Sequence, residues 1–141
     1  MSAKTDYLEQ KILDHVLNKV TLTSPTTYVA LYTAAPGETG GGTEVSGGGY
    51  ARQIVYENAN ASTPRWNLAA AEAGGGYVVD NAQDIVFPTA TADWGTIVAA
   101  AILDAATAGN MLYYGSLAAN KTVGQGDTFK FAAGDLDIIE R

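Results

Sequence analysis

The only histidine, His15, is the residue that could serve as the base of an acyl-transfer triad, because such a triad needs a group that takes up a proton near neutral pH. It is flanked by Lys11, Asp14 and Lys19, a setting typical of the solvated side of a helix. The serines stand outside the G-x-S-x-G frame of a nucleophile elbow, and the chain has no cysteine. We therefore expect no nucleophilic catalytic residue.

Acidic side chains form two close pairs in the sequence, Asp80 with Asp84 and Asp135 with Asp137. Glycoside hydrolysis needs two carboxyl groups about 5 to 10 Å apart, one of them protonated. A calcium loop needs oxygen ligands at alternate positions and a terminal Glu. In a chain that has no cysteine, a zinc site needs more than one His. Neither metal pattern is complete, so we expect no metal, no cofactor and acids that solubilise turns. A hydrolase built on one such pair is the least favoured alternative.

Glycine is concentrated in residues 37–49, which include triplets at 40–42 and 47–49. The spacing matches neither G-x-x-x-x-G-K-[ST] nor G-x-G-x-x-G, so no phosphate-binding loop is predicted. Glycine tolerates positive φ and allows close backbone approach, which suits a loop that lies across a neighbouring subunit. Tyr50 and Arg52 follow directly and are candidate interface residues. Arg52 is expected either to pair with an acid of a neighbour or to lie on the surface.

An amphipathic helix is predicted for residues 1–20, with Thr5 as its N-cap. Its apolar residues recur at helical spacing and cover about half of the circumference, more than docking on one partner requires; they are Leu8, Ile12, Leu13, Val16, Leu17 and Val20. The candidate interface residues are Leu8, Ile12 and Val16. The helix is expected either to cover its own sheet or to pack against another chain.

Residues 21–141 are predicted to form a β domain, and with the helix they make a single domain overall. Short strand patterns follow one another about every ten residues, separated by Gly, Asp and Asn turns, which indicates a mainly β fold, sandwich or barrel-like. The run 96–103 is apolar throughout and fits a buried helix or a strand. Its β-branched start and the Gly109-Asn110 turn before residues 111–114 favour a β-hairpin.

Charge limits the partners of the chain. Its 141 residues carry 8 basic and 15 acidic side chains, a net charge of −7. Residues 1–20 are neutral, so the whole excess lies in the β domain. Clustered Lys and Arg, which nucleic-acid binding requires, are missing, and an acidic surface is repelled by anionic membranes. No apolar run has the roughly 18 residues that a membrane-spanning helix needs. The charged residues among the first 20 also do not fit a signal peptide, which has an uncharged apolar stretch.

Two long runs carry a family resemblance: TYVALYTAAPGETGGGTEVSGGGYARQ (27–53) and FPTATADWGTIVAAAILDAATAGNMLYYGSLAANKTVGQGDTFKFAAGDL (87–136). Together they resemble a family of small bacteriophage virion proteins, usually labelled tail-fibre or minor structural proteins. The resemblance spans about residues 6–136 and is vaguest over 57–76. It implies a non-enzymatic virion structural protein, tail or tail-fibre associated and assembled in the host cytoplasm. Its expected partners are other virion proteins and copies of itself, in a homotrimer or another symmetric assembly. The shared motifs are structural, so they transfer no catalytic residue.

Two alternative roles remain open at this stage. The first is a capsid decoration protein, which would be present in hundreds of copies where a tail or fibre protein is present in tens. The second is a receptor-binding module that holds a host surface glycan by aromatic stacking. Trp66, in the loosely patterned middle of the chain, is the candidate glycan contact, whereas Trp94 is expected in the core because a strand begins beside it.

Overall fold

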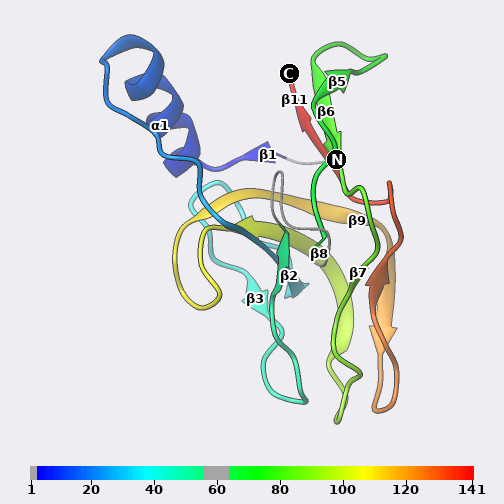
Figure 1. The fold of residues 1–141 in the computed structure, drawn as a ribbon. Coiled ribbons are helices and arrows are strands. Elements are labelled where there is room, and N and C mark those ends of the chain that lie inside the picture. Colours follow the sequence, from blue (N-terminus) through cyan, green and yellow to red (C-terminus); the bar gives the residue numbers. More distant parts are fainter. Residues whose placement is uncertain (1–2, 56–63) are drawn as a thin grey trace.

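The computed structural model describes residues 3–55 and 64–141, and in this part of the chain the fold is mainly β with a single N-terminal helix, as predicted (Figure 1). The helix and strands run in the order β1 (Ala3–Lys4), α1 (Asp6–Leu17), β2 (Thr27–Ala34), β3 (Thr43–Glu44), β4 (Gln53–Val55), β5 (Ala70–Ala71), β6 (Tyr77–Asp80), β7 (Ile85–Val86), β8 (Gly95–Leu103), β9 (Met111–Val123), β10 (Lys130–Phe131) and β11 (Asp137–Glu140). The described strands form three separate sheets and no closed barrel, so the barrel-like alternative is not what the chain adopts.

The largest sheet is antiparallel and has the order β1-β9-β8-β2-β3, with β4 also paired to β2. Its central strand β8 confirms the predicted hairpin, because it pairs with β9 on one side and β2 on the other. Both faces of β8 are covered: Ile97 and Ile102 enter the main core, while Ala99 and Leu103 belong to a second cluster on the other face. Burial on both faces explains why this strand is apolar throughout instead of alternating.

Two smaller sheets, β10-β7 and β11-β6-β5, supply the second layer. Ile85 and Phe87 from the β7 region and Phe129 and Phe131 from the β10 region join the core of the large sheet. The ring centroids of Phe87 and Phe129 lie 5.7 Å apart, edge to face, an arrangement that aromatic pairs prefer. The core therefore lies between the large sheet and the two small ones.

Helix α1 begins where the sequence predicts and ends earlier. The Thr5 Oγ1 accepts a hydrogen bond from the Leu8 backbone N–H at 3.4 Å and donates one to the Met111 carbonyl at 2.6 Å. The helix ends at Leu17, because Lys19 adopts a φ of 56° and turns the chain. Residues 3–4, which precede the Thr5 cap, form β1, whose Ala3 and Lys4 pair with β9. Figure 1 shows α1 beside β1 at the margin of the molecule.

Strand β9 carries a large bulge. Ile97 pairs with Lys121 and Ala99 pairs with Ser116, so residues 117–120 of β9 stand opposite a single residue of β8. A bulge of this kind bends a strand and re-aims its side chains. On its other edge β9 pairs, among the residues that the structure describes, only with the two residues of β1. The bend brings the bulged segment over the space between the large sheet and β10–β11, which shapes the pocket described below.

Candidate functional site

Helix α1 is apolar on two sides. On the side toward the sheet, Leu8 is 7% exposed and belongs to the main core, against which Ile12 packs. On the other side three aliphatic side chains are 58–71% exposed, and we call them the outer α1 face; they are Leu13, Val16 and Leu17. A helix that is apolar on two sides is normally covered on both. The outer α1 face is therefore a candidate contact surface.

The three interface residues predicted on the helix are thus separated by the structure. Leu8 lies in the core of its own chain, Ile12 is half-buried beside it, and only Val16 is exposed. The prediction passed over Leu13 and Leu17, although both have the same i+3 and i+4 spacing to their neighbours. Sequence spacing shows that the apolar arc is wide, but it does not show which part of the arc the sheet covers.

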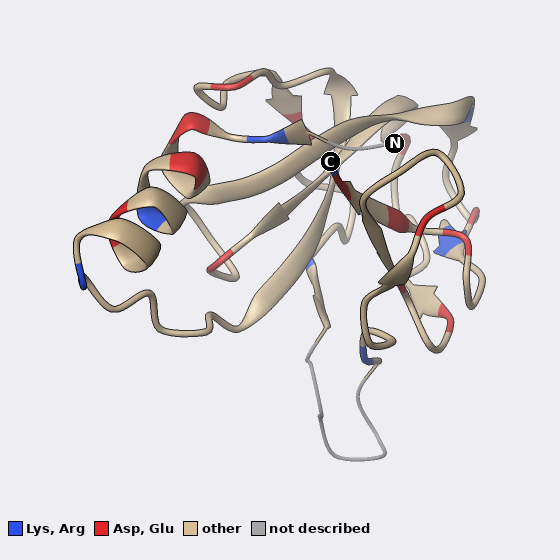
Figure 2. Ribbon diagram, turned by 90° about the horizontal axis from the view of Figure 1, so that it is seen from above, with Lys and Arg blue, Asp and Glu red and all other residues tan. Residues whose placement is uncertain are grey.

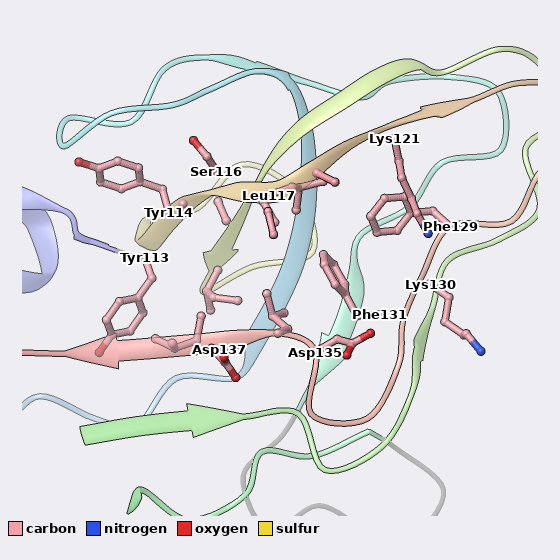
Figure 3. A pocket seen from close by; sticks show the side chains of 18 residues that line it. Tyr113, Tyr114, Ser116, Leu117, Lys121, Phe129, Lys130, Phe131, Asp135 and Asp137 are labelled. Atoms are coloured by element: carbon pink, nitrogen blue, oxygen red, sulfur yellow. The ribbon is translucent and has the colours of Figure 1, made fainter. Parts of the chain in front are cut away.

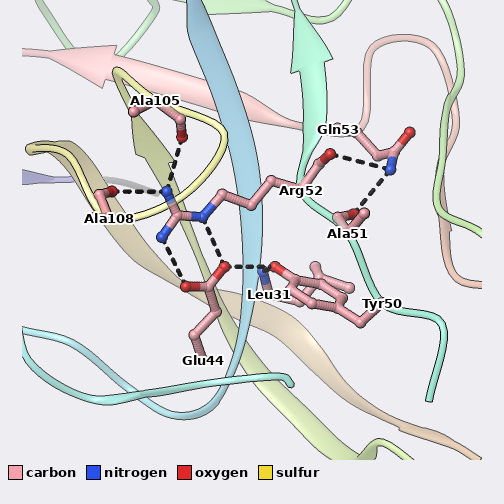
Figure 4. Close-up of polar contacts among 8 residues, drawn as sticks. All are labelled: Leu31, Glu44, Tyr50, Ala51, Arg52, Gln53, Ala105 and Ala108. Atoms are coloured by element: carbon pink, nitrogen blue, oxygen red, sulfur yellow. Dashed lines mark hydrogen bonds and ion pairs between the residues drawn. The ribbon is translucent and has the colours of Figure 1, made fainter. Parts of the chain in front are cut away.

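Arg52 joins three segments of the chain (Figure 4). Its Nε and Nη2 donate to the two carboxylate oxygens of Glu44, both at 2.8 Å, and its Nη1 donates to the carbonyls of Ala105 and Ala108, also at 2.8 Å. The Tyr50 hydroxyl donates to Glu44 at 2.9 Å and accepts from the Leu31 N–H at 3.0 Å. The acid that Arg52 binds is therefore its own Glu44. The cluster connects the glycine-rich loop, the start of β4 and the β8–β9 turn.

Burial and charge pairing set the proton affinities in this cluster. Burial raises the pKa of the Glu44 carboxyl, but hydrogen bonds from Arg52 and Tyr50 outweigh it and hold that pKa below its ordinary value. The hydrogen bond to Glu44 raises the pKa of Arg52, and burial raises the pKa of Tyr50 above its usual range. The ion pair therefore stays charged, and it fixes Tyr50 and Arg52 within the chain instead of presenting them to a neighbour.

The depressed pKa of Glu44 predicts acid sensitivity. Its stabilising effect is complete above the ordinary value of 4.5 and is lost as the pH falls through the lower pKa of the folded state. We expect Glu44→Gln to lower the urea midpoint at pH 7 and to make the fall of that midpoint between pH 5 and pH 3 shallower. Glu38→Gln, at an exposed position, is the control and should keep the wild-type slope. Equal slopes in the Glu44→Gln and wild-type chains would contradict the assignment.

The glycine-rich loop lies against its own chain. A Cβ at Gly42, which has a φ of +74°, would come within 2.6 Å of the Ala34 carbonyl oxygen. A Cβ at Gly48 would come within 2.9 Å of the Trp94 indole nitrogen, which donates to the Gly48 carbonyl at 2.8 Å. Trp94 is 6% exposed and lies in the core, as expected. These two glycines are explained by close approach within the chain, without a neighbouring subunit.

Trp66, the candidate glycan contact, is half-buried. Its indole N–H donates to the Thr27 Oγ1 at 3.0 Å, and its ring packs against the main core. Trp66 also forms an isolated bridge with Asn81. Its polar edge and part of its ring are therefore engaged within the chain, so the structure offers no argument for stacking on a sugar here.

The sequence did not reveal the pocket between β9 and β11, which we call the β9–β11 pocket (Figure 3). Its volume is about 390 Å³. The apolar side chains that line it include Leu117 from the β9 bulge and Phe131, Leu136 and Ile138 from the opposite wall. Charged side chains stand at its margin; they are Lys121, Lys130, Asp135 and Asp137. An apolar interior with charges of both signs around it suits an apolar segment of a protein better than a phosphate or a metal ion.

A buried asparagine holds one wall of this pocket. Asn81 is fully buried, and its amide donates to the carbonyls of Gln83 at 2.7 Å and Ala132 at 2.9 Å. Its side-chain oxygen accepts from the Leu136 N–H at 2.9 Å. The bonds to Ala132 and Leu136 connect the end of β6 to the loop between β10 and β11. Asn81 thereby positions Leu136 in the pocket.

Comparison with known proteins identifies the family. A family model described as podophage GP4 fiber I protein gp80 matches residues 3–139, nearly the whole chain. The chain belongs to this family of phage fibre proteins. The resemblance expected from the sequence is thereby confirmed, and the chain is a phage fibre structural protein and so a component of the virion. None of the curated proteins compared with this fibre protein is significantly similar to it.

The side chains considered for catalysis have local structural roles in this fibre protein. The Nδ1 of His15 accepts from the Leu22 N–H at 3.1 Å. Asp84 accepts from the Ala133 N–H at 2.9 Å, and its predicted partner Asp80 accepts from the Asn67 side-chain amide at 2.6 Å. In residues 3–55 and 64–141 no group of three or more His, Asp or Glu side chains could hold a metal ion, and no helix is long and apolar enough to cross a membrane.

Proposed function

We propose that this fibre protein is a non-enzymatic structural subunit that assembles on the phage tail as a symmetric oligomer, through the outer α1 face. The observation that carries the proposal is this face itself, where Leu13, Val16 and Leu17 stand together and are each more than half exposed. Removing apolar surface from water is favourable by roughly 25 cal/mol per Å², so a partner that covers the face is stabilised.

The distribution of charge supports a contact through the helix. The β domain carries the whole net charge of −7, whereas the first 20 residues are neutral. Figure 2 shows α1 with acidic and basic positions interspersed along it. Two β domains that met face to face would repel each other, but a contact that brings in α1 avoids part of this repulsion.

The oligomeric state of the purified chain tests the proposal. Light scattering should give a mass that is a multiple of 14.6 kDa, three times that value for a trimer. Leu17→Asp should yield a monomer with an unchanged circular dichroism spectrum, because Leu17 is 71% exposed. Leu68→Asp is the matched control, since Leu68 is 79% exposed outside the helix, and it should stay oligomeric. A wild-type chain that is monomeric at every concentration would overturn self-assembly.

The position on the particle needs a separate measurement. The copy number in purified virions, by quantitative mass spectrometry, is expected in the tens for a tail site. Hundreds of copies would instead favour the capsid decoration alternative. The glycan-binding alternative depended on Trp66, whose indole is bonded within the chain. Tryptophan fluorescence that does not change on addition of host polysaccharide would argue against glycan binding.

A further inference from the structure

The chain has two apolar surfaces that no described segment covers, the outer α1 face and the β9–β11 pocket. We propose that the outer α1 face of one copy docks in the β9–β11 pocket of the next copy, so that the subunits join head to tail in a closed ring. This rests on the proposed self-assembly and adds which surfaces meet. A contact between two different surfaces of the same chain generates a ring when its rotation closes.

The pocket supplies what an exposed helix face needs, which is apolar contact with walls on two sides. One wall is the β9 bulge with Leu117, and the other carries Leu136 and Ile138, all half-buried in the single chain. Phe131 lies deeper and is 8% exposed. The side chains of the outer α1 face are aliphatic, so they match the apolar walls of the pocket. Their insertion would complete the burial of both surfaces.

The charges around the two surfaces are complementary and set a direction. Asp6 and Glu9 stand in the first turn of α1, and Lys19 follows its last turn. On the pocket, Lys121 projects from the β9 wall, while Asp135 and Asp137 lie on the opposite wall (Figure 3). Among the described residues none of these six forms an ion pair within the chain. If the first turn of α1 points toward Lys121 and its C-terminal end toward Asp135 and Asp137, the acids of the helix face a lysine and Lys19 faces the aspartates.

Pairing of two outer α1 faces with each other is the competing arrangement. Three aliphatic side chains present only a few hundred Å² of apolar surface, whereas a stable interface buries about 800 Å² on each partner, so a contact made by two outer α1 faces alone is small. Parallel packing of several helices would also bring the exposed acids Asp6 and Glu9 of the copies together at one end of the assembly. The pocket adds walls on both sides of the helix and the opposite charges that self-pairing lacks.

Mixing two single variants tests the docking. Leu17→Asp disables the helix face and leaves the pocket intact, whereas Ala118→Arg obstructs the pocket at an exposed position of the bulge and leaves the helix intact. Each variant alone should be monomeric, and an equimolar mixture should form a heterodimer of twice the monomer mass. Ala73→Arg, exposed and away from the pocket, is the control and should assemble as the wild type does.

Each outcome of this experiment decides between the possibilities. An Ala118→Arg chain that assembles like the wild type would overturn the docking and leave the proposed self-assembly standing. A monomeric wild-type chain would overturn self-assembly itself, and the docking with it. Charge reversal gives a readout that does not depend on steric obstruction: Lys121→Glu should weaken assembly, and Glu9→Lys in the same chain should restore it. Failure of this rescue in a folded double variant would contradict the proposed direction of the helix.

Discussion

Replacing Arg52 with methionine is expected to lower the free energy of unfolding by about 3 kcal/mol. The side chain of Arg52 is 7% exposed, and its removal leaves the Glu44 carboxylate without a counter-ion. The carbonyls of Ala105 and Ala108 also lose their donor. Removing one partner of such a pair costs more than the pair contributes, because the remaining Glu44 charge, 25% exposed, stays partly desolvated. Urea unfolding followed by the fluorescence of the buried Trp94 measures the loss.

Two further variants separate the ion pair from general damage to the fold. Arg65→Met, at an exposed position, should change the free energy of unfolding by less than about 0.5 kcal/mol. The double variant Glu44→Leu with Arg52→Met should recover part of the loss, because it removes the unpaired charge together with its partner. If Arg52→Met cost less than about 1 kcal/mol, the cluster of Figure 4 would be no more than a surface pair.

Asn81→Ala is the second variant expected to have a large effect, also about 3 kcal/mol. The substitution leaves the carbonyls of Gln83 and Ala132 and the N–H of Leu136, which surround the fully buried Asn81 side chain, without their bonds. It also frees the wall of the β9–β11 pocket that Leu136 belongs to. Chemical denaturation gives the energy, and amide hydrogen exchange should show faster exchange at Leu136.

Asn120→Ala is the matched control for this prediction. Asn120 lies in the exposed part of the β9 bulge, so the same substitution there should change stability by less than about 0.5 kcal/mol. Slow exchange at Leu136 in the Asn81→Ala chain would mean that the loop between β10 and β11 keeps its conformation without the amide, contrary to the role assigned to Asn81.

Local sequence patterns predicted the elements that are specified by residues close together in the sequence. The Thr5 cap and the spacing of apolar residues gave α1, and the β-branched start of β8 with the Gly109-Asn110 turn gave the β8–β9 hairpin. The hairpin prediction held because its signals lie within a few residues of one another. The end of the helix was misplaced, since it depends on the positive φ of Lys19, a residue type that rarely adopts it.

The candidate surfaces were less accessible to sequence reasoning, because they depend on contacts between distant segments. Glu44 precedes Arg52 by eight residues, but the two meet only because the glycine-rich loop folds back on its own sheet. Asparagine is a residue type common in turns, and nothing near Asn81 in the sequence indicates bonds to residues 132 and 136. The β9–β11 pocket combines a bulge with strands that follow much later, so no local pattern could predict it.

The attachment of α1 has a mechanical consequence. The helix is joined to the sheet through the two residue pairs of β1, the bonds of Thr5 and the side chains of Leu8 and Ile12, whereas β8 and β9 are joined along eight residue pairs. Under tension applied to α1, the load passes first through this short connection. The helix would peel away at a force well below the one that shears the central strands. A subunit pulled by its neighbour would thus yield at the joint and keep its β domain folded, ready to dock again when the load falls.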